Sequence, residues 1–564
     1  MEKRTIIAFV LSFLVLIVWT QLFTPKPGLD KKEETVKTEE LEAISDFKKA
    51  MDSRPPGEAH LTAEPARSVV PNVDEKEILV DTPLYTAVFS NIGPTIKSFK
   101  LKNYRQSLDP ESPLIELVSF RKEAETYDEK EISAANFFLL NFRTLSSVQG
   151  ENMTYQVDQE AVRLGPGSSP ETLVFRAVSN DGLLMSQTFR FYPDQYKIDL
   201  DMNVENQSEI PAKGVFTAEI KALSSTEKKG YYSYVGLVLL MDGELQEMEI
   251  EEVSEKEESK GRIDWLAYED DYFISAVIPE ESLQATFKGR LSASGILAGT
   301  YYTPPVTLNP SNQETSRYSL YIGPRDLEIL KGVGSGLDRA IDFGWFDIIA
   351  KGFLYLLLFF NKYINNYGVS IILLTALVKV ILWPLSHKSY KSMKEMQKLQ
   401  PIMTKIREKY KNDKQKMNQE MMGLYKTYKV NPMGGCLPMI VQLPVFFALF
   451  RLLGSSIELR HAPFMFWIND LSAPDRLFHF SFSIPFMTPP CGIPVLTLLM
   501  GASMFIQQKM TPTPGDPAQA KMMMFMPILF TFMFINFPSG LVLYWLVNNI
   551  LSIGQQYRIM KSAA

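Results

Sequence analysis

Five long apolar runs, separated by polar segments, occupy most of the chain from residue 365 onward. We expect each run to form a membrane-spanning helix, because about 20 apolar residues in a helix match the hydrocarbon thickness of a bilayer. The predicted spans lie at about 365–385, 435–454, 492–508, 522–537 and 541–556. Several are short, and a short span is accommodated by local thinning of the bilayer or by snorkelling of flanking residues.

The N-terminus adds a sixth predicted span. Lys3 and Arg4 precede an apolar run at 6–19, as in a signal peptide, but no small-residue cleavage pattern follows. We therefore expect residues 1–24 to be an uncleaved anchor with its N-terminus in the cytoplasm. Residues 25–71 are rich in Lys, Glu and Pro and poor in large apolar side chains, which predicts a disordered tether.

Between the tether and the spans, the apolar pattern has a period of two. Residues 196–203 alternate apolar and polar side chains, which is typical of a half-buried strand. Further strands are predicted at 84–90, 95–101, 173–178, 184–192, 214–220, 272–279, 285–290 and 317–322. Many short strands with turn residues between them predict a large β-sandwich domain over 72–342.

Two parts of this domain depart from the strand pattern. Residues 326–342 have a helical pattern that glycines at 332, 334 and 336 interrupt, and we interpret these glycines as a hinge. They do not follow a strand and lack the lysine of a phosphate-binding loop. The acidic stretch 244–260 is expected to be a solvated loop or an exposed helix.

Two further segments have amphipathic helical patterns. Residues 343–364 are apolar but carry interspersed charges and a tryptophan near the start, which predicts a helix lying in the membrane interface. Residues 386–430 hold 12 Lys and Arg against 4 Asp and Glu, with a turn near 411–414, and predict a helical hairpin. Positive charge next to spans places this hairpin in the cytoplasm, which also places both termini there after six spans.

Methionines recur at helical spacing on the predicted hairpin. They are Met393, Met396, Met403, Met417 and Met421. One interpretation is that they form the seam between the two helices of the hairpin. The other is that they contact substrates or partners, because methionine suits surfaces that accept varied apolar groups. Both interpretations can hold together.

The charge distribution separates the chain into two environments. Residues 24–345 carry 34 basic and 54 acidic side chains, whereas the remainder carries 24 basic and 10 acidic ones, which together give the net charge of −6. An acidic domain outside the cytoplasm and basic cytoplasmic loops fit a membrane protein better than a nucleic-acid binder.

Within the predicted spans, Lys379 carries a charge. Such a charge either faces a cavity or a partner, or reaches the interface by snorkelling, since Lys379 lies six residues from Leu385. Gln442, Asn548 and Gln556 either line the same cavity or form hydrogen bonds between helices, and for Gln556 we favour the second interpretation.

The sequence gives no indication of an enzyme. The four histidines, at 60, 387, 461 and 479, are scattered, and no nucleophile elbow, metal-ligand spacing or phosphate loop occurs. We therefore expect no catalysis, no cofactor and no metal. A solute transporter would show internal repeats, and none is evident. An assembly factor without a groove remains a third alternative.

Several longer motifs resemble those of the YidC membrane protein insertases. They are NPMGGCLP at 431–438 with QLP at 442–444, ELRHAPF at 458–464, MFMP at 524–527 and FPSGLVLYW at 537–545, with DW and DYF at 264–265 and 271–273 of the strand-rich domain. The resemblance covers essentially the whole chain. It corresponds to the Gram-negative form, which has an additional anchor and a large periplasmic domain.

The resemblance implies an inner-membrane protein that inserts, folds and helps assemble other membrane proteins, alone or with the Sec translocon, without hydrolysing ATP. It implies a hydrophilic groove that opens to the cytoplasm within a five-helix core. The groove residues would be Lys379, where the family very often has arginine, with Gln442, Tyr544 and Asn548. The implied partners are nascent membrane proteins, the lipid bilayer, the Sec translocon, and the signal-recognition particle receptor or ribosome at the basic hairpin.

Overall fold

The computed structural model describes residues 75–122, 132–135, 137–144, 153–223, 234–248, 258–292, 295–428, 430, 437–511 and 517–561. These residues belong to one compact unit, Val73–Ala564. The predicted anchor at 1–24, the whole of the predicted tether at 25–71, and the first six residues of the motif at 431–438 lie outside the described residues.

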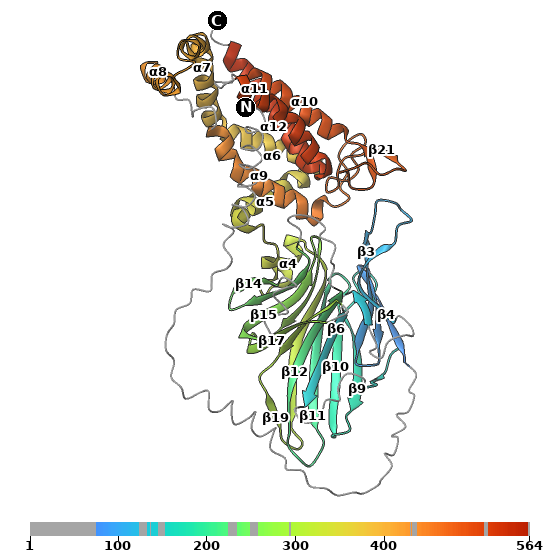
Figure 1. The fold of residues 1–564 in the computed structure, drawn as a ribbon. Helices are drawn as coiled ribbons and strands as arrows, with labels where there is room; N and C mark the ends of the chain where they lie inside the picture. The colour runs from blue at the N-terminus through green and yellow to red at the C-terminus, as the bar shows by residue number, and fades with distance from the viewer. Residues whose placement is uncertain are drawn as a thin grey trace, which may run out of the picture. The chain divides into compact units, whose positions relative to one another are not determined.

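The first half of this unit is built of strands (Figure 1). They are β1 (Glu77–Asp81), β2 (Tyr85–Ser90), β3 (Thr95–Arg105), β4 (Leu114–Lys122), β5 (Ile132–Ala135), β6 (Phe137–Thr144), β7 (Gln156–Val157), β8 (Ala161–Arg163), β9 (Glu171–Val178), β10 (Leu183–Phe191), β11 (Lys197–Asn206), β12 (Ala212–Leu223), β13 (Gly236–Met241), β14 (Glu244–Met248), β15 (Ser259–Glu269), β16 (Phe273–Pro279), β17 (Gln284–Leu291), β18 (Ile296–Tyr302), β19 (Val306–Leu308) and β20 (Gln313–Pro324).

These strands form two sheets. The smaller sheet has six strands in the order β5-β4-β3-β2-β1-β8, and the larger has 14 strands whose main path runs from β19 to β7. Phe89 of the small sheet lies edge-on to Phe189 and Phe191 of the large one, with ring centroids 5.1 and 5.6 Å away. Such edge-to-face pairs add to the free energy gained by burying the rings. The predicted sheet-rich domain is confirmed, and its two sheets pack against each other through aromatic side chains.

The interpretation of 244–260 as a loop or exposed helix was wrong for its described ends. β14 pairs with β13, and β15 begins at Ser259. Asp242 and Gly243, both with positive φ, form the tight turn between β13 and β14. An Asp-Gly pair is a strong hairpin signal because a two-residue turn of this kind needs positive φ at both positions. The run of acidic residues obscured that signal.

The second half of the unit is helical, and it continues from the last strand of the large sheet. Its elements are α4 (Leu327–Val333), η1 (Leu337–Ala340), η2 (Gly344–Phe346), α5 (Asp347–Ile364), α6 (Tyr367–Ile381), α7 (Trp383–Lys409), α8 (Lys414–Thr427), α9 (Leu437–Ser455), η4 (Ile457–Leu459), β21 (Leu477–Phe480), β22 (Cys491–Ile493), α10 (Val495–Met510), α11 (Pro517–Met533), η5 (Phe534–Asn536) and α12 (Ser539–Lys561).

The glycine interruption within 326–342 occurs as predicted. Asp326 caps the N-terminus of α4 by accepting hydrogen bonds from the amides of Glu328 and Ile329. Gly334 and Gly336 then adopt positive φ and separate α4 from η1. Glycine reaches these angles without the steric cost that other residues bear.

The first predicted core span ends earlier than expected. α6 stops at Ile381 and α7 starts at Trp383, with a bend of 65° between them, so the prediction of one span to Leu385 was wrong. Pro384 lies in the first turn of α7, where its ring is tolerated, but it cannot continue a preceding helix because it lacks an amide hydrogen and clashes with the previous turn.

α11 begins at Pro517, five residues before the predicted span at about 522–537. α12 is longer at both ends than the predicted span at 541–556, and the predicted hairpin at 386–430 is present as α7 and α8.

Among the described residues, one helix, Gly344–Ile364, is long and apolar enough to cross a membrane, and α6 with α7 pass the same test only as a bent pair. α6 has 15 residues, about 22 Å at 1.5 Å per residue, against a hydrocarbon core of about 30 Å. Helix length therefore does not confirm six spans, and the interfacial position of 343–364 stays a prediction.

The segment between α9 and α10 contacts the strand-rich domain. The Arg460 guanidinium donates a hydrogen bond of 2.7 Å to the carbonyl of Arg105 at the end of β3, and it lies over the rings of Tyr272 and Phe273. This segment is therefore on the same side of the helical bundle as the strands.

Candidate functional site

Lys379, the charge predicted inside a span, lies in the last turn of α6 and is only 9% exposed. Its neighbours Val380 and Ile381 are exposed, so the last turn of the helix buries its charged residue and exposes the two apolar residues that follow. The ammonium donates a hydrogen bond of 2.6 Å to the hydroxyl of Ser552 on α12. This direction, toward a neighbouring helix, favours an interior position over snorkelling.

Ser552 links Lys379 to the rest of α12. Its hydroxyl donates a hydrogen bond of 2.7 Å to the backbone carbonyl of Asn548, one turn earlier, and it also interacts with the hydroxyl of Tyr390 on α7. Ser552 and Tyr390 were not identified from the sequence. The spacing of Tyr544, Asn548 and Ser552 could have indicated Ser552, because residues four apart lie on one face of a helix.

The Lys379 ammonium has no acidic partner in the part of the chain that the structure describes. No Asp or Glu of this part lies within 4.0 Å of it. An ammonium carries three hydrogen-bond donors, and a buried charge is costly unless it is paired. Lys379 is thus a buried cation, held by a hydroxyl, with capacity for an anionic or carbonyl ligand.

The other predicted groove residues lie on α12 or contact it. Gln442 of α9 donates a hydrogen bond of 3.4 Å to the hydroxyl of Tyr544, whose ring is buried. Asn548 lies one turn further along α12 and is half-buried. Tyr544, Asn548 and Ser552 form what we call the polar stripe of α12. Its ends are eight positions apart, about 12 Å along the helix axis. Gln442 contacts one end through Tyr544 and Lys379 contacts the other through Ser552, so all four predicted residues lie in or against this stripe.

Further polar contacts fasten α12 to its neighbours. The Asn549 amide donates to the Ser503 hydroxyl on α10 at 3.0 Å, and the Gln556 amide donates to the carbonyl of Met510 at 2.9 Å. Gln556 therefore forms an interhelical hydrogen bond, as predicted. Lys394 of α7 donates to the carbonyls of Ile559 and Met560 at the C-terminus of α12, where a cation is favourable.

On the hairpin of α7 and α8, the predicted methionines divide into two groups. Met396 and Met403 are buried in the seam between the helices, and Met421 packs against them. Met393 and Met417 are half-buried. The seam interpretation thus accounts for three of the five, whereas contact with substrates or partners stays a prediction for all of them.

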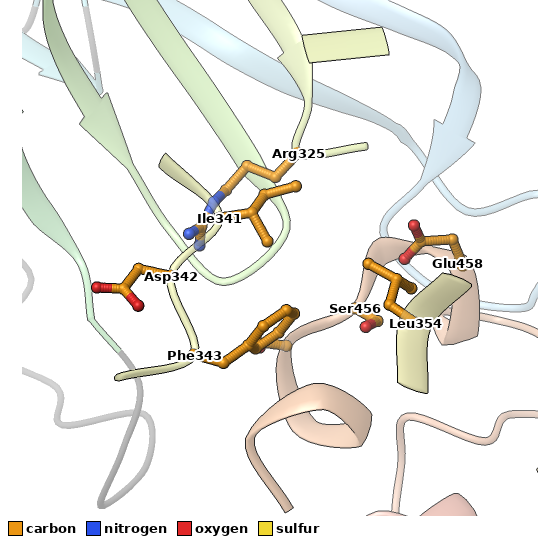
Figure 2. Close-up of a pocket in the computed structure, with 8 residues that line it drawn as sticks. Arg325, Ile341, Asp342, Phe343, Leu354, Ser456 and Glu458 are labelled. Carbon is orange, nitrogen blue, oxygen red and sulfur yellow. The ribbon is translucent and has the colours of Figure 1, made fainter. Parts of the chain in front are cut away.

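A small cavity lies away from the polar stripe (Figure 2). Arg325, Ser456 and Glu458 contribute to its lining, and burial raises the pKa of the Glu458 carboxyl to about 7. The Arg325 guanidinium is already occupied, because it donates to the carbonyls of Asp270 and Ala340 and pairs with Glu269 at 3.2 Å. The contacts of Arg325 therefore hold the chain together just after β20. None of the predicted site residues lines the cavity.

A bundle of apolar helices that holds a buried ammonium and continues from a large sheet-rich domain defines an integral membrane protein with an extramembrane domain. Residues 77–356 match the family described as the YidC periplasmic domain, and residues 359–564 match the family described as the 60Kd inner membrane protein. The chain belongs to the YidC family of membrane protein insertases.

Curated relatives match along their whole length. The "Membrane protein insertase YidC" of Pelobacter propionicus is 41% identical over 568 residues, covering 100% of this chain and 99% of the relative. The protein of the same name from Syntrophobacter fumaroxidans is 40% identical over 574 residues, covering 100% of both. A solved structure described as an active YidC insertase with its first transmembrane domain resolved covers 86% of this chain and 93% of its own, at 18% identity and a TM-score of 0.36.

This membership establishes the coarse function and location. The protein is an inner-membrane insertase with a periplasmic domain, and its family acts in the insertion of membrane proteins. The strand-rich half of the unit corresponds to the periplasmic domain, and the segment between α9 and α10 contacts it through Arg460.

Proposed function

We propose that this protein inserts client segments along the polar stripe of α12, with Lys379 as the group that attracts acidic residues of the client. The observation that carries the proposal is the buried Lys379 ammonium, bound to Ser552 and without an acidic partner among the described residues. A client carboxylate about 4 Å away would be attracted by roughly 4 kcal/mol at an effective dielectric constant of about 20.

The physical difficulty of insertion lies in the polar flank of the client. Each unsatisfied polar group in hydrocarbon costs several kcal/mol. A groove that is open to the cytoplasm and lined by Gln442, Tyr544, Asn548 and Ser552 would shorten the apolar path. Short helices such as α6 would thin the bilayer that remains. The client's apolar span then partitions into lipid, and the membrane potential assists where its charge permits, without ATP hydrolysis.

The basic hairpin of α7 and α8 suits partners at the cytoplasmic surface. Its excess of Lys and Arg over Asp and Glu fits the acidic surface of a ribosome or of the signal-recognition particle receptor. In this proposal both termini are cytoplasmic, and the protein acts alone on short clients and with the Sec translocon on longer ones.

The test is the insertion of a short, Sec-independent client with an acidic outward tail, measured by protease protection in cells that depend on Lys379→Ala, Lys379→Arg or Lys379→Glu. We expect Arg to support insertion, Ala to reduce it and Glu to abolish it. Lys388→Ala is the matched control, because Lys388 is an exposed lysine on α7. A second client, with the tail carboxylates changed to amides, should lose its dependence on Lys379.

Normal insertion by all three variants at equal protein levels would contradict a role of the ammonium. A loss that is the same for acidic and amide tails would also contradict it, and would assign Lys379 a purely structural role. A protein needed only for assembly of the Sec translocon would leave the Sec-independent client unaffected in all variants.

A further inference from the structure

The segment between α9 and α10 contains a stretch without formal charge. Residues 477–493, which we call the aromatic loop, contain no Asp, Glu, Lys or Arg. The aromatic loop includes the paired strands β21 and β22. Phe478, Phe482 and Phe486 are exposed by 69%, 62% and 76%. Large aromatic side chains gathered on a surface mark a site of interaction rather than a surface that faces water.

The aromatic loop is held firmly to the helices beneath it. The amide side chain of Asn536, at the end of η5, accepts a hydrogen bond of 2.9 Å from the backbone amide of Thr488 and donates one of 2.8 Å to the carbonyl of Phe486. The Arg476 guanidinium donates to the carbonyls of Pro490 and Ile535 at 3.2 and 2.8 Å. These bonds satisfy the backbone of the aromatic loop without burying its phenylalanines.

Two of the exposed phenylalanines have an unfavourable backbone conformation. Phe478 and Phe486 have φ of 56° and 65°, in the left-handed region that residues other than glycine rarely adopt. Gly492 packs so closely against the carbonyl of Phe478 that a Cβ there would clash. Such strain persists only where the surroundings impose it, and both rings are exposed.

The aromatic loop continues the lipid-facing surface of α11. Phe525, Ile528 and Phe532 are exposed and spaced three and four residues apart, so they form one apolar face of that helix. In an inner-membrane protein, such a face meets lipid. The ring of Phe486 lies 5.3 Å from that of Phe532, centroid to centroid, at the periplasmic end of the face.

We infer that the aromatic loop inserts into the periplasmic leaflet of the bilayer, with Phe478, Phe482 and Phe486 at the boundary between headgroups and acyl chains. The lack of charge favours lipid as the occupant, because protein interfaces are typically enriched in arginine as well as aromatic residues. The phenylalanines alternate with the hydroxyls of Ser481, Ser483 and Thr488. This mixture suits the interfacial region, where apolar side chains contact acyl chains and polar groups contact hydrated headgroups. The aromatic loop thereby extends the apolar reach of the 16-residue α10, which alone spans about 24 Å.

The test places a nitroxide spin label at position 478, 482 or 486 of the full-length protein, in a background with Cys436→Ser and Cys491→Ser. Each protein is reconstituted into vesicles of phosphatidylethanolamine and phosphatidylglycerol, and collisions with oxygen and with a water-soluble nickel chelate are measured. Matched controls carry the label at Ile528, on the lipid-facing side of α11, and at Glu314, on the exposed part of β20.

We expect the oxygen-to-nickel collision ratio at the three loop positions to exceed that at Glu314 several-fold and to approach that at Ile528. A ratio like that of Glu314 places the aromatic loop in water and overturns the inference. Low accessibility to both reagents places it against protein, and overturns it too. If a label at 486 disturbs the contact with Phe532 and reduces client insertion, positions 478 and 482 decide the result. This outcome is independent of the role proposed for Lys379.

Discussion

Ser552→Ala removes the hydroxyl that lies 2.6 Å from the Lys379 ammonium. The carbonyl of Asn548, which also loses a donor, keeps its ordinary backbone hydrogen bond, because it lies four residues before Ser552 in the helix. The loss therefore falls on the buried ammonium and on the Tyr390 hydroxyl, which also interacts with Ser552. A hydrogen bond to a charged group contributes about 1.5–3 kcal/mol to stability, and we expect Ser552→Ala to lower the free energy of unfolding by that amount.

A double-mutant cycle isolates this interaction. In a Lys379→Met background the Ser552 hydroxyl keeps its interaction with Tyr390 but has no cation to bind. Ser552→Ala should therefore cost less there than in the parent protein, and the difference, about 1.5–3 kcal/mol, is the contribution of the hydrogen bond to the ammonium. The free energy of unfolding is measured in mixed micelles, together with insertion of the acidic-tailed client. Ser370→Ala is the control, because the Ser370 side chain is buried in α6 and bonds to the carbonyl of Asn366.

The result that would refute this reasoning is an equal cost of Ser552→Ala in both backgrounds. The hydroxyl would then stabilise the packing of α12 by itself and would do nothing for the ammonium. A similar coupling between Ser370→Ala and Lys379→Met would show that the cycle reports a general loosening of α6.

Three further changes are predicted from other parts of the structure. Burial raises the pKa of the Glu269 carboxyl from 4.5 to about 7 against the opposing effect of Arg325, so the carboxyl binds a proton more tightly in the folded protein than in the unfolded chain. The free energy of unfolding should therefore fall by roughly 3 kcal/mol as the pH rises through this window. Glu269→Gln should remove that part of the pH dependence in denaturant titrations. Gly501→Ala would place a Cβ against Thr531 where α10 meets α11, whereas a Cβ at Gly554 meets nothing within 4 Å. The midpoint temperature of thermal unfolding should therefore fall for Gly501→Ala and stay unchanged or rise for Gly554→Ala. Equal shifts of the two variants would exclude close packing as the cause. Met403→Ser should increase proteolysis of the hairpin, because Met403 is 1% exposed in the seam, while Met422→Ser, at a side chain 55% exposed, should not; equal sensitivity of both would contradict the seam.

The strand-rich domain was predicted best where only one face of a strand is covered. β11 alternates buried and half-buried side chains along its whole length, and the sequence pattern has the same period. β13 is buried at every position, so its apolar run carries no alternation. β14 was hidden by acidic residues whose side chains face outward. Strands covered on both faces, such as β13, give no period-two signal.

The candidate site was predicted in part for a similar reason. Lys379 was identifiable because a charge within an apolar run is unusual in any context. Ser552 was not, since serine is common in membrane helices and its role depends on how α6 packs against α12. The end of α6 was misjudged because apolar residues continue past it to Leu385, whereas Pro384 decides where the helix stops.

α12 is attached to its surroundings at both ends. At its first turn, the amides of Ser539 and Gly540 donate to the carbonyls of Ala473 and Leu471, and the Ser539 hydroxyl donates to the carbonyl of Asp470. Near its other end, Gln556 and Lys394 hold it to α10 and α7. A helix anchored in this way cannot slide along its axis without breaking several hydrogen bonds. The polar stripe is therefore expected to keep a constant depth in the membrane, and along the insertion path proposed above each client segment would meet Tyr544, Asn548 and the Lys379-bound Ser552 at the same three depths.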